Sequence, residues 1–367
     1  MMPAFGQARE RLTALFSGKR ETIGLDIGSS AVKLVQLGEK AGRYELKGFA
    51  LTPLPPDAVG DGTIKDPPAV VDAIRESVGT AGVKGKDAVI GVSGQSLIMK
   101  KIPLPKVSPK DLAEAIQLEA EHHIPFAIDD VYLDYQVVGE SPREGGMMDV
   151  ILVAVKKTKV EEYLTVVEGA GLHPVVVDVD AFALENQFEL NYPDRERETV
   201  ALIDIGAAVM KTNVVRGGAS IFARDIAFGG NNYTQAIAQR LNIPWDTAEA
   251  AKCGQEVPGV KWDDLVPSLE AVSRELSLEI QRSFDYFTSL SESDRIDRIV
   301  LSGGCTRLPG IDAFLSASWG VPVEIVKPFE AVQAPPDRFP REELDAAAPM
   351  LAVAVGLGIR HRGDKPR

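Results

Sequence analysis

Ile23-Gly24-Leu25-Asp26-Ile27-Gly28-Ser29-Ser30 decides the fold, because a later stretch repeats its pattern, Val200-Ala201-Leu202-Ile203-Asp204-Ile205-Gly206. In both stretches an apolar strand ends in an aspartate, and a glycine follows two residues later. A second apolar strand comes next, at Ala31–Val35 and at Lys211–Val215. Each stretch therefore predicts a β-hairpin, and the repeat predicts a chain built from two similar halves.

The two predicted turns are suited to phosphate binding. Gly28 and Gly206 have no Cβ, so backbone N–H groups there can approach a phosphate closely. Asp26 and Asp204 can hold Mg²⁺, usually through water, because that ion dehydrates reluctantly. A single turn of this kind is usually a plain hairpin. Two of them, facing each other, would hold the phosphates of one nucleotide from both sides.

A third motif lies in Arg298–Gly310. There Gly303 and Gly304 follow a short apolar strand, and a predicted helix comes after them at Ile311–Ser318. A strand that ends in two glycines can admit a flat ring against bare backbone, and Arg307 can stack its guanidinium plane on an adenine. On its own the motif would be an ordinary strand–helix turn.

Together the three motifs resemble phosphate-1, phosphate-2 and adenosine of the actin, Hsp70 and sugar-kinase superfamily. Val175–Asn186 and Ala352–Gly358 resemble its two connecting helices, and Glu249-Ala250-Ala251-Lys252 resembles the helix that contacts ribose and adenine. Phe228-Gly229-Gly230-Asn231 resembles the step that opens the distal part of the second lobe. The resemblance implies an α/β, actin-like (ribonuclease H-like), two-lobed ATPase fold.

The same resemblance implies a ligand and its residues. The ligand is ATP or ADP with Mg²⁺, the metal being held by Asp26 and Asp204, and Asp180 is a tentative catalytic or water-orienting group. The implied nucleotide-binding residues are Gly28, Ser29, Ser30, Lys33, Gly206, Ala207, Gly229, Gly230, Glu249, Lys252, Gly303, Gly304 and Arg307.

The segment between Val92 and Val175 separates the branches of this superfamily. Its predicted strands and helices form a small α+β insertion in the first lobe, similar to the extra subdomain of FtsA. The segment from Ser108 through Tyr135 resembles the PilM family of type IV pilus assembly proteins. That resemblance implies a cytoplasmic ATP-binding scaffold of the pilus inner-membrane assembly complex.

The resemblance to PilM also implies partners. In that family the N-terminal cytoplasmic tail of PilN lies in a groove between the first lobe and the insertion, which would recruit the chain to the inner face of the inner membrane. Further expected components are PilO, reached through PilN, the assembly ATPases and a PilC-type platform. Ile102, Leu104, Phe126 and Ile128 are apolar residues near prolines that suit the groove wall, although they suit a plain core equally. A tail in the groove would pair with a strand edge.

The second phosphate turn departs from strongly hydrolytic relatives. Ala207-Ala208-Val209 stands where Hsp70-like chains carry further glycines and a threonine hydroxyl. Because phosphoryl transfer depends on positioning and charge stabilisation, we expect at most a slow ATPase. Two alternative functions stay open: an FtsA-like filament-forming or cell-division actin homologue and, with weaker support, a small-molecule kinase.

Composition limits the classes of function and the cellular compartments that remain. The net charge of −13 argues against nucleic-acid binding. The longest nearly apolar stretch, Met350–Ile359, is far shorter than the ~20 residues that a membrane span needs. Cys253 and Cys305 are the only cysteines and have no metal-ligand spacing, which fits a reducing cytoplasm.

These motifs divide the chain into successive segments. The predicted segments are an N-terminal tail (1–20), first-lobe core (21–96), inserted subdomain (97–172), connecting helix with return to the first-lobe core (173–198), second-lobe core (199–228), distal subdomain (229–297), second-lobe core with the adenosine motif and return helix (298–360), and a C-terminal tail (361–367).

Overall fold

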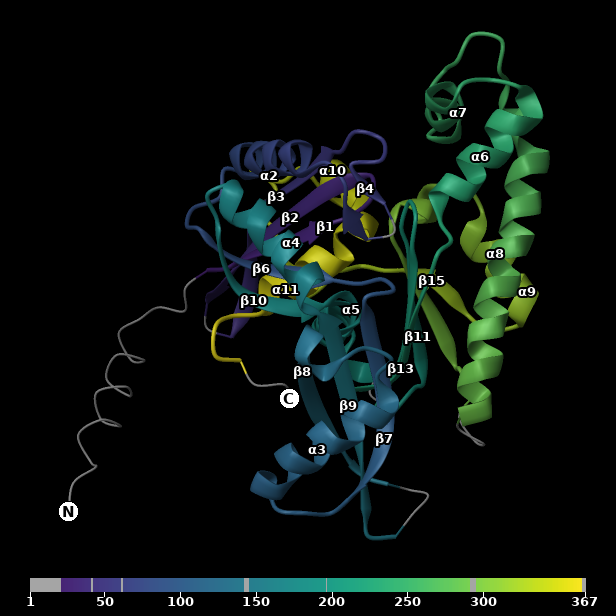
Figure 1. Cartoon of the computed structure of the whole chain (residues 1–367). Coiled ribbons are helices and arrows are strands. Elements are labelled where there is room, and N and C mark those ends of the chain that lie inside the picture. Colours follow the sequence, from purple (N-terminus) through teal and green to yellow (C-terminus); the bar gives the residue numbers. More distant parts are fainter. Residues whose placement is uncertain are drawn as a thin grey trace.

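The computed structural model of the protein describes residues 21–364, apart from residues 41, 61, 142–144, 196 and 291–294. The tail expected at 1–20 and the last three residues of the tail expected at 361–367 lie outside this part of the chain. Two lobes stand side by side, and a smaller unit extends below the first lobe (Figure 1).

Each lobe is built on one large sheet. The first sheet contains, in spatial order, β10 (His173–Val179), β6 (Asp87–Val92), β1 (Ile23–Ile27), β2 (Ala31–Lys40), β3 (Arg43–Pro53) and β16 (Val332–Gln333). The second contains β13 (Ala219–Ile226), β12 (Met210–Arg216), β11 (Val200–Ile205), β14 (Arg298–Ser302) and β15 (Val323–Ile325).

The two sheets share one topology. β1 is antiparallel to β2 and parallel to β6, and β11 is antiparallel to β12 and parallel to β14. Five strands in each lobe therefore follow the same order, and the predicted pair of hairpins is confirmed. Along the central strands, successive side chains point to opposite faces of the sheet and both sets are buried, because each face is covered by other elements.

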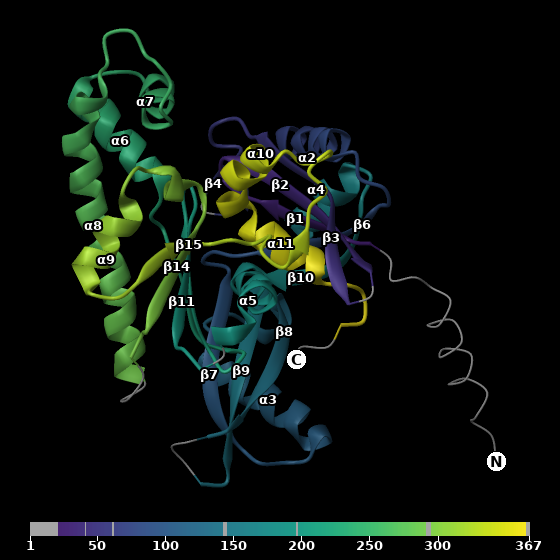
Figure 2. The ribbon, with the colours of Figure 1, turned by 180° about the vertical axis from the view of Figure 1, so that it is seen from behind.

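Helices cover both faces of each sheet, and two of them lie between the lobes (Figure 2). The first lobe carries α2 (Pro67–Ala81), α4 (Lys157–Gly169), α10 (Arg341–Ala347) and the short strands β4 (Val59–Gly60) and β5 (Thr63–Ile64). The second carries α6 (Gly230–Leu241), α7 (Trp245–Lys252), α8 (Trp262–Leu290) and α9 (Ile311–Trp319). Between the sheets lie α5 (Asp180–Asn191) and α11 (Ala352–Ile359).

Glycine lets the two central helices approach each other and the first sheet closely. A Cβ on Gly356 of α11 would lie 1.8 Å from the carbonyl oxygen of Ala183 in α5. A Cβ on Gly24 of β1 would lie 2.2 Å from the carbonyl oxygen of Ala354. These contacts join the lobes through backbone packing, so the relative position of the lobes depends on α5 and α11.

The small subdomain is a three-stranded sheet with one helix. Its strands lie in the order β7 (Leu97–Pro105), β9 (Met147–Lys156) and β8 (Val131–Glu140), and α3 (Pro109–His123) packs against them. α4, which the sequence assigns to this unit, packs instead on the first sheet, because Tyr163, Val166 and Val167 are buried in the core of that lobe.

α6 begins at Gly230, where the side chain of Asn232 accepts a hydrogen bond from the backbone N–H of Gly229. Within the described part of the chain, no helix is both long enough and apolar enough to span a membrane.

Candidate nucleotide cleft and partner groove

The two phosphate hairpins carry the same charged pair. Asp26 lies opposite Lys33 across β1 and β2, and Asp204 lies opposite Lys211 across β11 and β12. The Nζ–Oδ2 distance is 2.9 Å in the first pair and 3.4 Å in the second. Each of these two aspartates therefore has a lysine of the neighbouring strand as an ion-pair partner.

Lys211 is the charge centre of the cleft. Its Nζ lies 3.0 Å from Oδ2 of Asp180, besides its contact with Asp204. Burial opposes the charge, but the carboxylates of Asp180, Asp204 and Asp26 together raise the pKa of Lys211 well above its ordinary value. Burial likewise opposes the charge of Asp26, whereas Lys33 and Lys211 lower the pKa of that carboxyl.

These pairs bear on the predicted Mg²⁺ site. Asp204 also accepts a hydrogen bond from the Ser302 hydroxyl at 2.9 Å, so both of its oxygens have partners. No group of three or more metal-binding side chains occurs in the described residues. Direct coordination by several carboxylates therefore does not fit this cleft. A Mg²⁺ held through water beside Asp26 and Asp204 stays a prediction.

The predicted catalytic residue, Asp180, is the first residue of α5. One of its oxygens is taken by Lys211, and the other, Oδ1, is buried without a hydrogen-bond partner in the part of the chain that the structure describes. A Cβ on Gly91 would lie 2.0 Å from this oxygen, so β6 backbone covers it. Asp180 has one uncommitted oxygen, as a water-orienting group needs, but that oxygen is enclosed.

The predicted residues of the first hairpin form a tight turn. The Gly28 N–H donates to the Ala31 carbonyl at 3.1 Å, and the Ser30 carbonyl accepts from Leu54 at 2.9 Å. A Cβ on Gly28 would lie 2.4 Å from the Lys33 ammonium. The turn thus presents Ser29 and Ser30 beside a cation, which suits an anionic ligand.

The second hairpin is held against the start of α6. Gly230 N–H donates to the Gly206 carbonyl at 2.9 Å, and Asn231 N–H donates to the Ala207 carbonyl at 2.8 Å. A Cβ on Gly229 would lie 2.4 Å from the Gly206 oxygen. The structure therefore brings together four predicted nucleotide-binding residues from two distant segments. They are Gly206, Ala207, Gly229 and Gly230, and the site that they form is here called the nucleotide corner.

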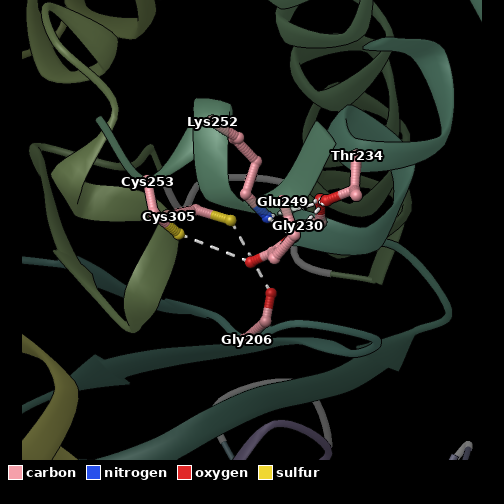
Figure 3. A network of polar contacts seen from close by, with 7 residues as sticks. All are labelled: Gly206, Gly230, Thr234, Glu249, Lys252, Cys253 and Cys305. Carbon is pink, nitrogen blue, oxygen red and sulfur yellow. Dashed lines mark hydrogen bonds and ion pairs between the residues drawn. The ribbon is translucent and has the colours of Figure 1, made fainter. Parts of the chain in front are cut away.

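A polar network extends this corner to α7 (Figure 3). The Lys252 ammonium donates to the Gly230 carbonyl at 3.1 Å, to the Thr234 hydroxyl at 2.9 Å and to the Glu249 carboxylate at 2.7 Å. Burial opposes the charge of Glu249, but Lys252 and Thr234 lower the pKa of that carboxyl. Lys252 and Glu249 therefore fix each other next to the Gly229–Gly230 step.

The third motif completes the corner. Gly303 has φ +89°, and a Cβ there would lie 2.4 Å from the Ile205 carbonyl oxygen, so only glycine fits. Cys305 packs next to Gly206, and burial raises the pKa of its thiol to about 12, which marks it as a packing residue. Gly304 and Arg307 are exposed at the rim.

A separate groove of about 890 Å³ lies between the first lobe and the small subdomain. Its lining residues include Tyr132, Leu133, Asp134, Tyr135 and Gln136 of β8, Val177, Asp178 and Val179 of β10, Glu185, Asn186 and Glu189 of α5, and Ile359, Arg360, His361 and Asp364 at the C-terminal end. Both β8 and β10 are edge strands, each paired with a single neighbour in the described residues.

The four residues proposed for the groove wall lie elsewhere. Ile102 and Leu104 are each 2% exposed and belong to the core of the small subdomain, and Phe126 and Ile128 pack against that core. None of them lines the groove. The small sheet has two faces, and Ile102 and Leu104 lie on the one that packs against α3. The groove is instead lined by β8 and by Val153 and Val155 on the other face of β9.

Two sets of site residues were not predicted from the sequence. Lys211 could have been found, because it follows Asp204 by seven residues, as Lys33 follows Asp26. Glu185 and Glu189 had no comparable signal, since they are ordinary residues of a connecting helix until the small subdomain is placed beside them.

The duplicated lobes, the paired phosphate hairpins and the Gly303 turn define this protein as a member of the actin-like ATPase fold class. Comparison with protein families gives a closer relationship, since the family described as type IV pilus assembly protein PilM matches residues 24–362. The chain belongs to this family.

Solved structures agree with this assignment. A structure of a PilM–PilN type IV pilus biogenesis complex superposes with a TM-score of 0.83 at 32% identity, covering 93% of this chain and 98% of that one. MreB5 of Spiroplasma citri bound to AMPPNP shares the fold, with a TM-score of 0.52 and 12% identity over 93% of this chain and 95% of that one.

Cell division proteins FtsA are more distant relatives. The Pseudomonas aeruginosa protein is 23% identical over 87% of this chain and 85% of its own length. The Escherichia coli K12 protein is 24% identical over 64% of this chain, and the match spans 60% of that protein.

Proposed function

We propose that this protein is a nucleotide-binding scaffold of the type IV pilus inner-membrane assembly complex and that its groove binds the N-terminal cytoplasmic tail of PilN. The groove between β8 and β10 carries this proposal, because it offers two unpaired strand edges to an extended peptide. Main-chain hydrogen bonds would then supply affinity. Binding of the tail would recruit the protein to the inner face of the inner membrane and connect it, through PilN, to PilO.

The cleft would bind ATP or ADP, with Mg²⁺ held through water and by the phosphates. Gly28, Ser29, Ser30 and Lys33 would contact the phosphates from the first lobe, and the Gly206–Gly230 corner would do so from the second. Glu249, Lys252, Gly303, Gly304 and Arg307 would surround the nucleoside. Because Lys211 occupies one oxygen of Asp180, we propose at most slow hydrolysis, so the nucleotide would act mainly as a conformational ligand. Contacts with the assembly ATPases and a PilC-type platform belong to the same proposal.

Isothermal titration calorimetry tests the groove. A synthetic peptide of the N-terminal cytoplasmic residues of PilN from the same organism, here called the tail peptide, is titrated into the protein. Val177→Trp places a large ring in the groove at a side chain that is 36% exposed, and we expect it to weaken binding at least tenfold. Leu278→Trp on the exposed face of α8 is the matched control. If the tail peptide does not bind the unchanged protein, the proposal is wrong.

Because the chain is related to FtsA, a filament-forming function is the second candidate. Sedimentation with ATP separates the two, since a scaffold of the proposed kind stays in the supernatant. Filaments that pellet in an ATP-dependent manner would favour the second candidate.

A further inference from the structure

The lining of the groove is strongly acidic. It contains five carboxylates, Asp134, Asp178, Glu185, Glu189 and Asp364, whereas Arg360 is the only lysine or arginine among its described lining residues. Arg360 lies near Asp178 and Asp364, with 3.6 Å from its Nε to an oxygen of each. The described lining therefore holds more carboxyl groups than lysine and arginine side chains, and three of these carboxyl groups belong to β8 and α5.

These carboxylates lie close enough to influence one another. Burial is the main cause that raises the pKa of Asp178, and the charge of Asp134 raises it further, while Arg360 opposes. Burial and then Glu189 raise the pKa of Glu185 to about 8, and Asp178 adds to this effect. Glu185 is therefore mostly protonated near neutral pH, and a cation placed beside it would favour its ionised form.

Asp178 also has an unused hydrogen-bonding atom. It is 8% exposed, and its Oδ1 accepts the Val179 N–H at 2.8 Å. Its Oδ2 has no hydrogen-bond partner among the described residues, and neither has the nearby Nε of Arg360. A buried carboxylate oxygen without a hydrogen bond is costly. An incoming donor with a positive charge would satisfy it.

We propose that the groove recognises a positively charged group of the bound tail, which is held between Asp178 of β10 and the Glu185–Glu189 face of α5. This inference rests on the proposed function, and it adds the chemistry that the tail must carry. The group is a primary ammonium or a guanidinium. It comes from the α-amino end of the tail or from a lysine or arginine side chain. Strand pairing with β8 and β10 positions the tail, and the charge sets its register.

Calorimetry with altered tail peptides tests this inference without changing the protein. In one peptide the α-amino group is acetylated; in the others each lysine is replaced by norleucine or each arginine by citrulline, one at a time. We expect one of these changes to weaken binding about tenfold or more, the scale of a charge-assisted hydrogen bond. Which change does so identifies the source of the charge.

A double-mutant cycle locates the group. Glu185→Gln and Asp178→Asn keep the shape of each side chain, and Glu275→Gln on the exposed face of α8 is the control. Removing the critical charge from the peptide should cost much less in at least one groove variant than in the control. Thermal unfolding verifies that each variant is folded.

The possible outcomes separate the two proposals. If the tail peptide binds and every charge-removed form binds equally well, the charge inference is overturned and the proposed function stands. The charge inference is likewise overturned, and the proposed function stands, if removing one peptide charge weakens binding by the same factor in every protein variant. If no form of the peptide binds, the proposed function fails and the inference fails with it.

Discussion

At the scale of single residues, three carboxylates each lie beside a lysine. Lys33 and Lys211 come from corresponding positions of the two hairpins; Lys33 pairs with Asp26, and Lys211 pairs with both Asp180 and Asp204. A buried carboxylate without such a partner would be strongly unfavourable. The lysines therefore allow an acidic cleft to fold before any ligand is present, and they leave little room for direct metal coordination.

Glu185 gives a prediction at the same scale. Its pKa is about 8 in the folded protein, raised by burial, Glu189 and Asp178, although Ser220 and Asn213 hydrogen-bond to it. Between about pH 4.5 and 8 the folded state keeps a proton that the unfolded state loses, so stability falls as pH rises. Glu185→Gln should remove this loss and stabilise the protein by about 2 kcal/mol more at pH 8 than at pH 5, after a reduction for partial exposure.

Thermal unfolding at the two pH values measures this effect. Glu275→Gln, on the exposed face of α8, should behave as the unchanged protein at both. An equal effect of Glu185→Gln at pH 5 and pH 8 would show that the carboxyl titrates normally.

At the scale of elements, close backbone approaches hold the nucleotide corner together. The β11 hairpin, the start of α6 and the turn after β14 meet at Gly206, Gly229 and Gly303, with no room for a Cβ at the last two. The corner therefore depends on the shape of three backbone segments more than on any one side chain.

Two glycines test this dependence. Gly303→Ala should force β14 away from Ile205 and weaken nucleotide binding at least about tenfold, because the residue has positive φ and its Cβ would meet the Ile205 oxygen. Gly79→Ala in α2, outside the nucleotide corner, is the control, since nothing lies within 4 Å of its Cβ. Titration of a fluorescent ATP analogue measures both. Equal affinities of the two variants would contradict a tightly packed corner.

At the scale of the whole molecule, α5 reaches both sites. Asp180, its first residue, pairs with Lys211 in the cleft, and Glu185 and Glu189 on the same helix line the groove. The Gly94 N–H of the first lobe donates to Asp225 of the second at 2.5 Å, so the lobes also touch beside the cleft. A movement of the lobes would thus be transmitted to the groove by one rigid helix.

This arrangement predicts coupling between the two ligands. We expect the tail peptide to change nucleotide affinity at least about fivefold, and nucleotide to change peptide affinity by the same factor, as linkage requires. Titrations of each ligand with and without saturating amounts of the other measure the two factors. Val177→Trp, which blocks the groove, should abolish the effect of the peptide. If neither ligand changes the affinity for the other, the nucleotide is a structural ligand only.

The sequence by itself determined the duplicated hairpins, the glycine turn after Arg298–Ser302, the connecting helices and the presence of a small insertion. These features depend on local patterns: apolar runs, turn glycines and acids at strand ends. The repeated spacing of Asp26 to Lys33 and Asp204 to Lys211 was also present in the sequence, although only the paired strands made its meaning clear.

Only the tertiary structure decided the position of the groove and the lobe to which α4 belongs. Ile102 and Leu104 look like a rigid groove wall in sequence, but their side chains face α3 in a closed core. The groove between the first lobe and the small subdomain is bordered by strand edges and by a face of α5 that lie far apart in the chain. Sheet edges and helix faces acquire partners only when the subdomains pack, because no local pattern encodes which edge stays unpaired.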